Sequence, residues 1–421
     1  MGIGVSRTGI TDLPLHNGTA PRWLFNRIVK LAGAISDVMV LECGSEEYLR
    51  RLADPFWFQA FSCVLGFDWH SSGTTTVTCG ALKKALEGRK DLVVVGGKGK
   101  VSLRTPEEIA FHADLNDISE EHQDRLVYVS RMCAKVDNAA IQDGHRLYHH
   151  ALAFDDRGNW TVIQQGMSDL AGYARRYQWS SRDLSGFIEE PHTCILGNRV
   201  DGTLDMTSPL SLESRKVAVD LVNDGVGKLE KEILRVAKGQ TTIDEWCGLR
   251  PKKLDMPRTV NWRALRAAYE FQPSNYEELL AIRGVGPSAV RALALTGELI
   301  YGAGPSWNDP VKFSFAVGGK DGVPYPVDRK AMDQAIELVP DDPVGMRPLL
   351  ERLRDDARVD AVLLTGGTGL SSRDQTFETV TALITKQLPG YGELFRMLSY
   401  QEIGAAAMLS RPMRAPWQLP A

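Results

Sequence analysis

The sequence predicts a multidomain α+β protein of three successive regions: a mixed α/β region over residues 1–204, a helical region over 205–337, and a partial α/β segment over 338–421. Three observations lead to this prediction. The chain has 421 residues, more than one core usually serves. Its first half mixes strand-like runs with helical patterns and holds all eight histidines. After residue 340 the pattern changes to a helix followed by an apolar strand, which is typical of an open α/β sheet.

The composition is that of a soluble globular protein, with 43% apolar and 24% charged residues. A net charge of −4 argues against a surface that is basic all over, but it allows a local basic patch. The six cysteines form no C-x-x-C pair, which fits a reducing cytoplasm better than a zinc or disulfide framework. No apolar run reaches the roughly 18 residues that span a bilayer, and no signal peptide is recognisable. We therefore expect a cytoplasmic protein without a membrane partner.

The first region contains helical patterns at residues 20–35 and 45–53, and Ser45 is a natural N-cap for the second. The stretch LVVVGGKGKVSL (92–103) predicts a strand, a glycine turn and a second strand. Residues 147–167 predict a β-hairpin, because apolar residues alternate on both sides of the turn sequence DRGN at 156–159.

Acidic and histidine side chains gather within nineteen residues at the start of this hairpin: Asp137, Asp143, His145, His149, His150 and Asp155. Carboxylates in such a cluster can hold Mg²⁺ for phosphodiester cleavage, which makes Asp137 and Asp143 candidate catalytic residues. The alternative is a polar row on the solvent-facing side of the hairpin.

The second region carries a basic tract and a glycine turn. Between residues 228 and 266 there are ten Lys or Arg residues against five Asp or Glu, and Lys252 and Lys253 are adjacent within the tract. Such a tract is either a solvated helix face or a nucleic-acid footprint. It is followed by NYEELLAIRGVGPSAVRALALTGELI (275–300), which predicts two short helices joined at Gly284-Val285-Gly286.

Two helices joined by G-V-G predict a helix-hairpin-helix that binds the DNA backbone. The glycines allow backbone N–H groups to converge at the start of the second helix, where the helix dipole favours phosphate. The alternative is an ordinary corner between two helices.

Residues 1 to about 337 resemble an uncharacterised prokaryotic family, a domain of unknown function, through TGITDLPLHNGTAPRWL, VDNAAIQDGHRLYHHALAFD and GNWTVIQQGM. This resemblance implies no particular chemistry. The glycine hairpin itself is similar to that of base-excision glycosylases, in which a catalytic aspartate follows the hairpin. That similarity implies Asp328, within PYPVDRKAMDQAI, although a helix N-cap also explains an aspartate there. Ser288 stands where bifunctional glycosylases have a lysine nucleophile, so lyase chemistry is not implied.

The C-terminal segment resembles the three-layer molybdopterin-binding domain of molybdenum-cofactor biosynthesis proteins, including molybdopterin adenylyltransferase. The matching stretches are VPDDP, VDAVLLTGGTGLSSRDQT and LPGYGELFRMLSYQEIGAAAMLSR. The resemblance implies that Asp374 serves a metal-assisted step and that the pterin phosphate is approached by Gly366, Gly367, Thr368 and Gly369. The order of strand and loop agrees with this assignment, because strand 359–365 would place the glycine loop at its carboxyl end, where α/β sheets bind ligands.

The flanks of this domain are not recognisable in the sequence. The family's first strands should precede residue 338, and its closing strand should follow residue 414. We therefore expect the central half of a domain, with weak ligand binding and exposed sheet edges that a second copy of the chain could cover. Three functions stay open: a DNA-binding or DNA-processing protein, a molybdenum-cofactor biosynthesis protein, and a scaffold without catalysis.

Overall fold

The computed structural model describes residues 13, 15, 20–67, 71–116, 118–168, 172–238, 256–311, 347–348 and 350–352. The chain divides into two compact units, Met1–Asp328 and Arg329–Ala421. In the second unit the described residues are helical. The architecture below is that of the first unit. The expected domain boundaries near residues 204 and 337 stay predictions.

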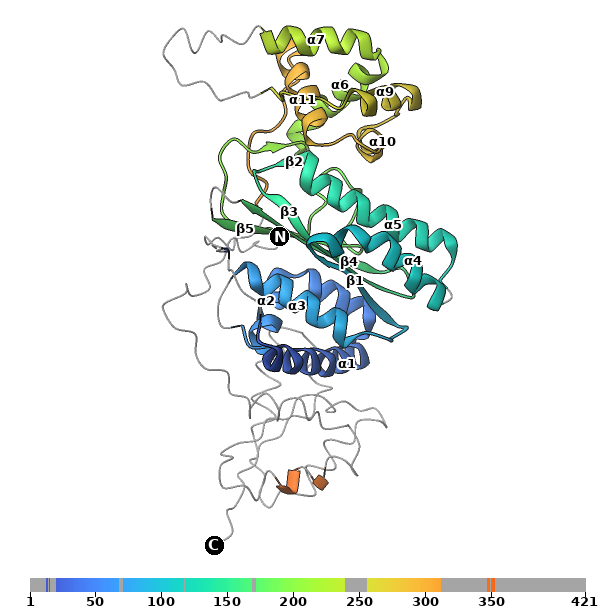
Figure 1. Ribbon diagram of the computed structural model, residues 1–421, viewed down its shortest axis with the longest axis vertical. Helices are drawn as coiled ribbons and strands as arrows, with labels where there is room; N and C mark the ends of the chain where they lie inside the picture. The colour runs from blue at the N-terminus through green and yellow to red at the C-terminus, as the bar shows by residue number, and fades with distance from the viewer. Residues whose placement is uncertain are drawn as a thin grey trace, which may run out of the picture. The chain divides into compact units, whose positions relative to one another are not determined.

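A five-stranded antiparallel sheet forms the centre of the first unit (Figure 1), with strand order β1-β3-β4-β5-β6. Its strands are β1 (Leu92–Lys98), β3 (Arg146–Asp155), β4 (Trp160–Ser168), β5 (Tyr173–Ser180) and β6 (Cys194–Leu196). A two-stranded ladder pairs β2 (Ile141–Gln142) with β7 (Leu204–Asp205).

The predicted hairpin is confirmed as β3 and β4, which pair in antiparallel register. The carboxylate of Asp155 sets the turn, because it accepts hydrogen bonds from the backbone N–H groups of Arg157 (3.0 Å) and Asn159 (2.9 Å). This local capping by an aspartate is the usual way in which such turns are stabilised.

One face of the sheet is covered by α1 (Arg22–Ala53), α2 (Pro55–Val64) and α3 (Ser72–Ala85), as Figure 1 shows. Polar side chains of the sheet reach the backbone of α1: Thr161 donates to the carbonyl of Leu49 (2.5 Å), and Gln178 donates to that of Leu52 (2.9 Å). The two helices expected at 20–35 and 45–53 form one element with a break at Gly44, whose φ is 83°. Ser45 follows this break, and its hydroxyl donates to Asp155 (2.8 Å).

The other face is covered by α4 (Thr105–Leu115), α5 (Glu120–Lys135) and a π-helical turn, η2 (Val136–Ala140). Alternate sheet residues point into this core, where Leu152, Val162 and Trp179 belong to the same buried cluster as Leu126 and Met132 of α5. The core on this face is therefore mainly apolar.

The second strand expected within 92–103 is wrong, because residues Gly99–Arg104 form the 3₁₀ helix η1. The glycines explain the difference. Gly99 has a φ of 62° and begins η1, where the chain leaves the sheet, whereas Gly96 and Gly97 also have positive φ but still pair with β3. A Cβ on Gly96 would lie 2.2 Å from the carbonyl oxygen of His150, so this approach of two backbones requires glycine.

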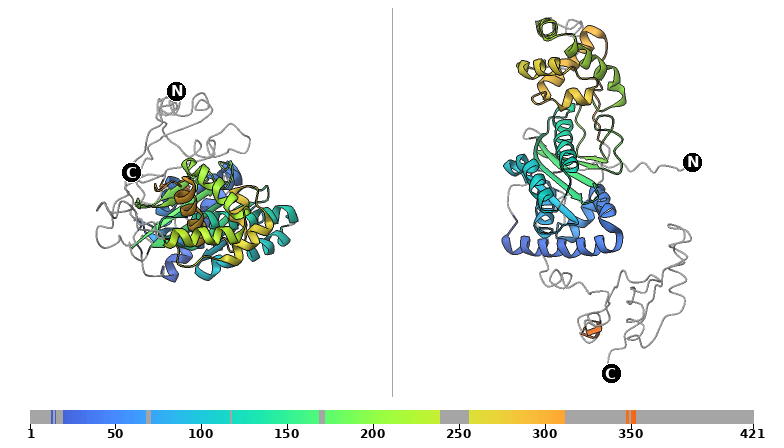
Figure 2. Two further views of the ribbon diagram at one scale, coloured as in Figure 1. Left: turned by 90° about the horizontal axis from the view of Figure 1, so that it is seen from above. Right: turned by 90° about the vertical axis from the view of Figure 1, so that its right-hand side faces the viewer.

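The helical region comprises η3 (Pro209–Ser211), α6 (Leu212–Asn223), α7 (Val226–Lys238), α9 (Trp262–Phe271), α10 (Tyr276–Ala281) and α11 (Pro287–Tyr301). Figure 2 shows these helices together at one end of the unit. Their apolar faces join the core on the α5 side of the sheet, since Leu221, Leu265 and Leu293 belong to the cluster that contains Trp179. Within the part of the chain that the structure describes, no helix is long and apolar enough to cross a membrane.

Candidate functional site

The turn between α10 and α11 is built around two glycines with different roles. Gly284 has a φ of 91°, and a Cβ there would lie 2.9 Å from Nδ2 of Asn261. Gly286 has extended backbone, begins α11 as its N-cap, and has open space around it. Val285 between them is buried. The two helices expected within residues 275–300 are therefore present, while Lys252 and Lys253 lie outside the described residues.

A lysine from α5 holds this turn from the inside. The ammonium of Lys135 donates to three carbonyl oxygens, those of Leu280 (2.8 Å), Ile282 (2.6 Å) and Val285 (2.8 Å). Burial lowers the pKa of Lys135 to about 8. Among the hydrogen bonds of the described residues, none uses the backbone N–H of Gly284 or Gly286. The turn thus has its carbonyls satisfied by Lys135 and keeps donors available.

A cavity of about 930 Å³ lies beside the turn, between α5, η1 and β3. Arg283 of the turn lines it together with Arg131 and Lys135 of α5, and Asp124 lines it as an acidic residue. The charged lining is therefore mainly cationic. Tyr128 and Tyr148 contribute aromatic surface.

A polar relay, defined here as Ser130, His150, Gln164 and Asp137, begins at this cavity and runs into the core. The Oγ of Ser130 lies 2.9 Å from Nε2 of His150. The Nδ1 of His150 lies 2.8 Å from Oε1 of Gln164, and Nε2 of Gln164 donates to Oδ2 of Asp137. The first three residues line the cavity, and Asp137 is fully buried.

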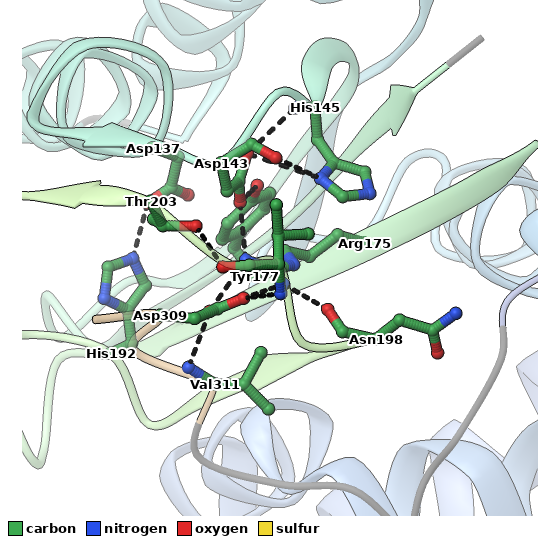
Figure 3. A network of polar contacts seen from close by, with 11 residues as sticks. Asp137, Asp143, His145, Arg175, Tyr177, His192, Asn198, Thr203, Asp309 and Val311 are labelled. Atoms are coloured by element: carbon green, nitrogen blue, oxygen red, sulfur yellow. Dashed lines mark hydrogen bonds and ion pairs between the residues drawn. The ribbon is translucent and has the colours of Figure 1, made fainter. Parts of the chain in front are cut away.

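Asp137 has two further partners at the buried end of the relay, of which Figure 3 shows His192. Its Oδ1 lies 2.5 Å from Nε2 of His192, and its Oδ2 accepts a hydrogen bond from Nε1 of Trp179 (3.1 Å). Burial raises the pKa of Asp137, although the charge of His192 and the hydrogen bond to it act in the opposite direction. His192 lines a second cavity of about 280 Å³, so the buried hydrogen bonds connect two cavities.

Asp143, the other candidate catalytic carboxylate, belongs to an ion-pair network near the same face of the sheet (Figure 3). Its Oδ2 accepts from Arg175 (2.8 Å) and from the hydroxyl of Tyr177 (2.5 Å). Arg175 also pairs with Asp309 (2.6 Å). Burial alone would raise the pKa of Asp143, but hydrogen bonding to His145 and the charge of Arg175 lower it to about 2.

The expectation of a solvent-facing polar row is wrong, because all six of its members are buried. Their roles also differ. Asp155 caps the hairpin turn, whereas His149 points to the α1–α3 side of the sheet, and neither of its ring nitrogens has a hydrogen-bond partner. In the described part of the chain, no group of three or more His, Cys, Asp or Glu side chains is placed to hold a metal ion. The proposed Mg²⁺ role of Asp137 and Asp143 therefore has no ligand cluster there.

Several candidate residues lie outside the described residues, namely Asp328, Gly366, Gly367, Thr368, Gly369 and Asp374. Other residues of the site were missed in the sequence: Ser130, Gln164, Arg175, Tyr177, Trp179, His192 and Asp309. The only available signal was the pair of glutamines at 164 and 165, since uncharged polar residues inside an apolar strand require buried partners.

Residues 9–327 match the model of a protein family of unknown function, DUF763. The chain belongs to the DUF763 family. The match covers the whole described sheet and the helical region, so the cavity, the relay and the α10–α11 turn all lie in the DUF763 region, defined as residues 9–327.

Residues 329–419 match the model of a probable molybdopterin binding domain. Molybdenum cofactor biosynthesis protein B of Bacillus subtilis (strain 168) is 50% identical over 78 residues, which are 18% of this chain and 46% of the relative. A probable molybdopterin adenylyltransferase of Methanocaldococcus jannaschii is 40% identical over 76 residues, 18% of this chain and 47% of the relative. The chain thus spans about half the length of these curated relatives. No solved structure matches the chain.

Proposed function

We propose that residues 329–419 bind molybdopterin. The proposal rests on the 50% identity over 78 residues with a molybdenum cofactor biosynthesis protein. The loop TGGTG at 365–369 lies within the matched range, and its glycines would allow close approach of backbone N–H groups to a phosphate. By the same resemblance, Asp374 would act in a metal-assisted step such as adenylyl transfer.

Calorimetric titration of the whole chain with molybdopterin, and separately with ATP and Mg²⁺, tests this proposal. We expect saturable binding of molybdopterin. Asp374→Ala should reduce the response to ATP and Mg²⁺ more than the response to molybdopterin, and Asp356→Ala serves as a matched carboxylate control outside the loop. Absence of any heat with molybdopterin would overturn the proposal.

A second function is proposed for the DUF763 region, namely binding of the nucleic-acid backbone by the α10–α11 turn. Two observations support it: Lys135 donates to three carbonyl oxygens of the turn, and the N–H groups of Gly284 and Gly286 have no acceptors among the described residues. Free donors at a helix N-terminus favour phosphate. Arg283 is exposed beside them and adds positive charge.

Gly286→Leu is a sharp test, because the backbone at Gly286 suits any residue and the space around it is open. The variant should fold normally while its side chain blocks the approach of a phosphate. We expect its affinity for duplex DNA, measured by fluorescence anisotropy, to fall about tenfold or more for every sequence, or about 1.4 kcal/mol. Gly186→Leu is the control, since Gly186 also has open surroundings. Wild-type binding that is absent or independent of salt would contradict the proposal and favour the scaffold.

One further assay on labelled duplex, run with and without Mg²⁺, distinguishes the reactions that the two sets of candidate residues would catalyse after DNA binding. If the glycosylase similarity holds, base release needs no metal and is lost in Asp328→Asn. If the carboxylates act through a metal, strand cleavage needs Mg²⁺ and is lost in Asp143→Asn with folding verified separately. Binding without either product leaves a nucleic-acid-binding module.

A further inference from the structure

The cavity beside α5 contains a hydroxyl group in contact with the ring nitrogen of a histidine. Ser130 and His150 both line the cavity, and the Oγ–Nε2 distance is 2.9 Å. This is within the range at which a histidine acts as general base for a serine nucleophile. The two residues come from different elements, α5 and β3, so the contact depends on the tertiary fold.

The remaining members of the polar relay fix the protonation of His150. Nε1 of Trp179 can only donate, and it donates to the same oxygen of Asp137 that Gln164 contacts, so this oxygen is an acceptor. The amide nitrogen of Gln164 therefore faces Asp137, and its oxygen faces Nδ1 of His150. It follows that Nδ1 carries the proton and that the lone pair of Nε2 points at Ser130. Burial lowers the pKa of His150, which keeps the ring neutral at pH 7.

The charges around the cavity indicate the substrate class. Arg131 is adjacent to Ser130 in sequence, and Arg283 lies on the α10–α11 turn; both line the cavity and both are exposed. Two guanidinium groups near a nucleophile are suited to the oxygens of a phosphate ester. We propose that Ser130, with His150 as its general base, is the nucleophile of a phosphodiester-cleaving site in this cavity. The substrate class rests in part on the proposed binding of nucleic acid by the adjacent turn.

The reaction is balanced without a further reactant except water. The Oγ of Ser130 attacks phosphorus as its proton moves to Nε2 of His150, and the P–O bond to the leaving alcohol breaks. The leaving oxygen keeps the electron pair of that bond and takes the proton from His150, giving an alcohol and a phosphoserine diester. Water then attacks the same phosphorus, His150 accepts its proton, and the serine oxygen leaves and is reprotonated.

The test uses the whole chain with bis(4-nitrophenyl) phosphate, a small diester that does not need the backbone N–H groups of Gly284 and Gly286 for binding. We expect a burst of 4-nitrophenolate stoichiometric with the protein, with and without Mg²⁺. Acid quenching followed by peptide mass analysis should place the phosphoryl adduct on Ser130. Because this measurement needs no variant, it stands even where substitutions in the core disturb folding. Failure of DNA to bind would contradict the proposed function of the turn without affecting this result.

Variants separate catalysis from structure. Ser130→Ala should abolish both burst and adduct, and His150→Gln should slow the burst about 100-fold or more. Ser62→Ala is the matched control, because Ser62 is also a buried serine, but its hydroxyl contacts Thr78 and the carbonyl of Phe58 in place of a histidine. Gln164 is a positioning residue, so Gln164→Met should change the ¹⁵N signals of His150 from one tautomer to a mixture. A folded wild-type protein that gives no adduct, or an adduct at another residue, would overturn the proposal.

Discussion

Arg175 and Arg176 are consecutive in β5 and equally buried, yet they lie in opposite surroundings. Arg175 faces the α5 side and pairs with Asp143 (2.8 Å) and with Asp309 (2.6 Å). Arg176 faces the α1–α3 side, where its contacts are Thr75 Oγ1 (3.5 Å) and the ring of Phe58 (4.6 Å), and its Nε and Nη2 have no hydrogen-bond partner.

The pKa values of the two arginines differ, and this difference reflects the different surroundings on the two faces of the sheet. The pKa of Arg175 is raised, because its carboxylate partners outweigh burial, whereas burial lowers the pKa of Arg176 to about 10. Buried charges require partners, and removing one partner costs far more than replacing an unpartnered charge. On the mainly apolar α5 side the buried charge of Arg175 is therefore paired with carboxylates, while on the α1–α3 side the buried charge of Arg176 has only a hydroxyl and an aromatic ring as partners.

The largest expected effect on stability comes from removing Arg175, the cation of the paired network. Arg175→Met leaves Asp143 and Asp309 buried without their cation, so the free energy of unfolding should fall by about 3–5 kcal/mol. Urea denaturation measures this loss. Lys216→Met, which removes an exposed pair with Glu213, is the control and should change stability by less than about 0.5 kcal/mol. If Arg175→Met lowers the free energy of unfolding by less than about 1 kcal/mol, Asp143 and Asp309 do not depend on Arg175 as their buried cation.

The second prediction concerns pH on the side of Arg176. Burial, with smaller contributions from His150 and Lys98, lowers the pKa of His149 to about 3 from 6.5. Between these values the unfolded chain binds more protons, so stability is complete above pH 6.5 and is lost as the pH falls toward 3. His149 alone should contribute a loss of about 2 kcal/mol between pH 7 and 5. His149→Leu should remove this part of the pH dependence of stability. If the free energy of unfolding depends on pH equally in His149→Leu and in the wild type, the ring of His149 is not held neutral by burial.

The third prediction is that removing Arg176 stabilises the protein, whereas removing Arg175 destabilises it. Arg176→Met keeps the contact with Phe58 and removes a buried charge that lacks a carboxylate partner among the described residues. The free energy of unfolding should rise by about 1 kcal/mol or more. A loss comparable to that of Arg175→Met would mean that Arg176 has a partner of equal strength.

The smallest effect is expected at Thr75. At 3.5 Å its contact with Arg176 is a weak hydrogen bond, so Thr75→Val, which keeps the side-chain shape, should change the free energy of unfolding by less than about 0.5 kcal/mol. A larger loss would show that this hydroxyl is a principal partner of Arg176.

Much of the fold could be predicted from local patterns. The hairpin of β3 and β4 followed from alternation around DRGN, and the helices on either side of Gly284 followed from their apolar spacing. The pairing of β1 with β3 could not be predicted, since it joins segments separated by α4 and α5. The strand expected after Gly99 was wrong because Gly99, which has positive φ, begins a 3₁₀ helix at the end of β1.

The candidate site was only partly predictable. Asp137 and Asp143 were predicted to be metal-binding carboxylates or members of a solvent-facing polar row, and their burial was not foreseen. Their partners explain why they are buried, and these partners are distant in sequence: Arg175 and Asp309 for Asp143, and His192 for Asp137. Ser130 has no distinctive neighbours in the sequence, and only the fold brings it to His150.

The bridge between Asp205 and Ser306 bears on the order of folding. The chain leaves β7 at Asp205, forms all the helices from α6 to α11, and returns so that Asp205 N–H donates to the carbonyl of Ser306 (2.9 Å). Closing a loop of about 100 residues costs roughly 4 kcal/mol of chain entropy, which must be offset by contacts already formed. We expect this bridge to form late, after the sheet and the helices have docked. Changes at Ser306 should then accelerate unfolding and leave the folding rate almost unaltered.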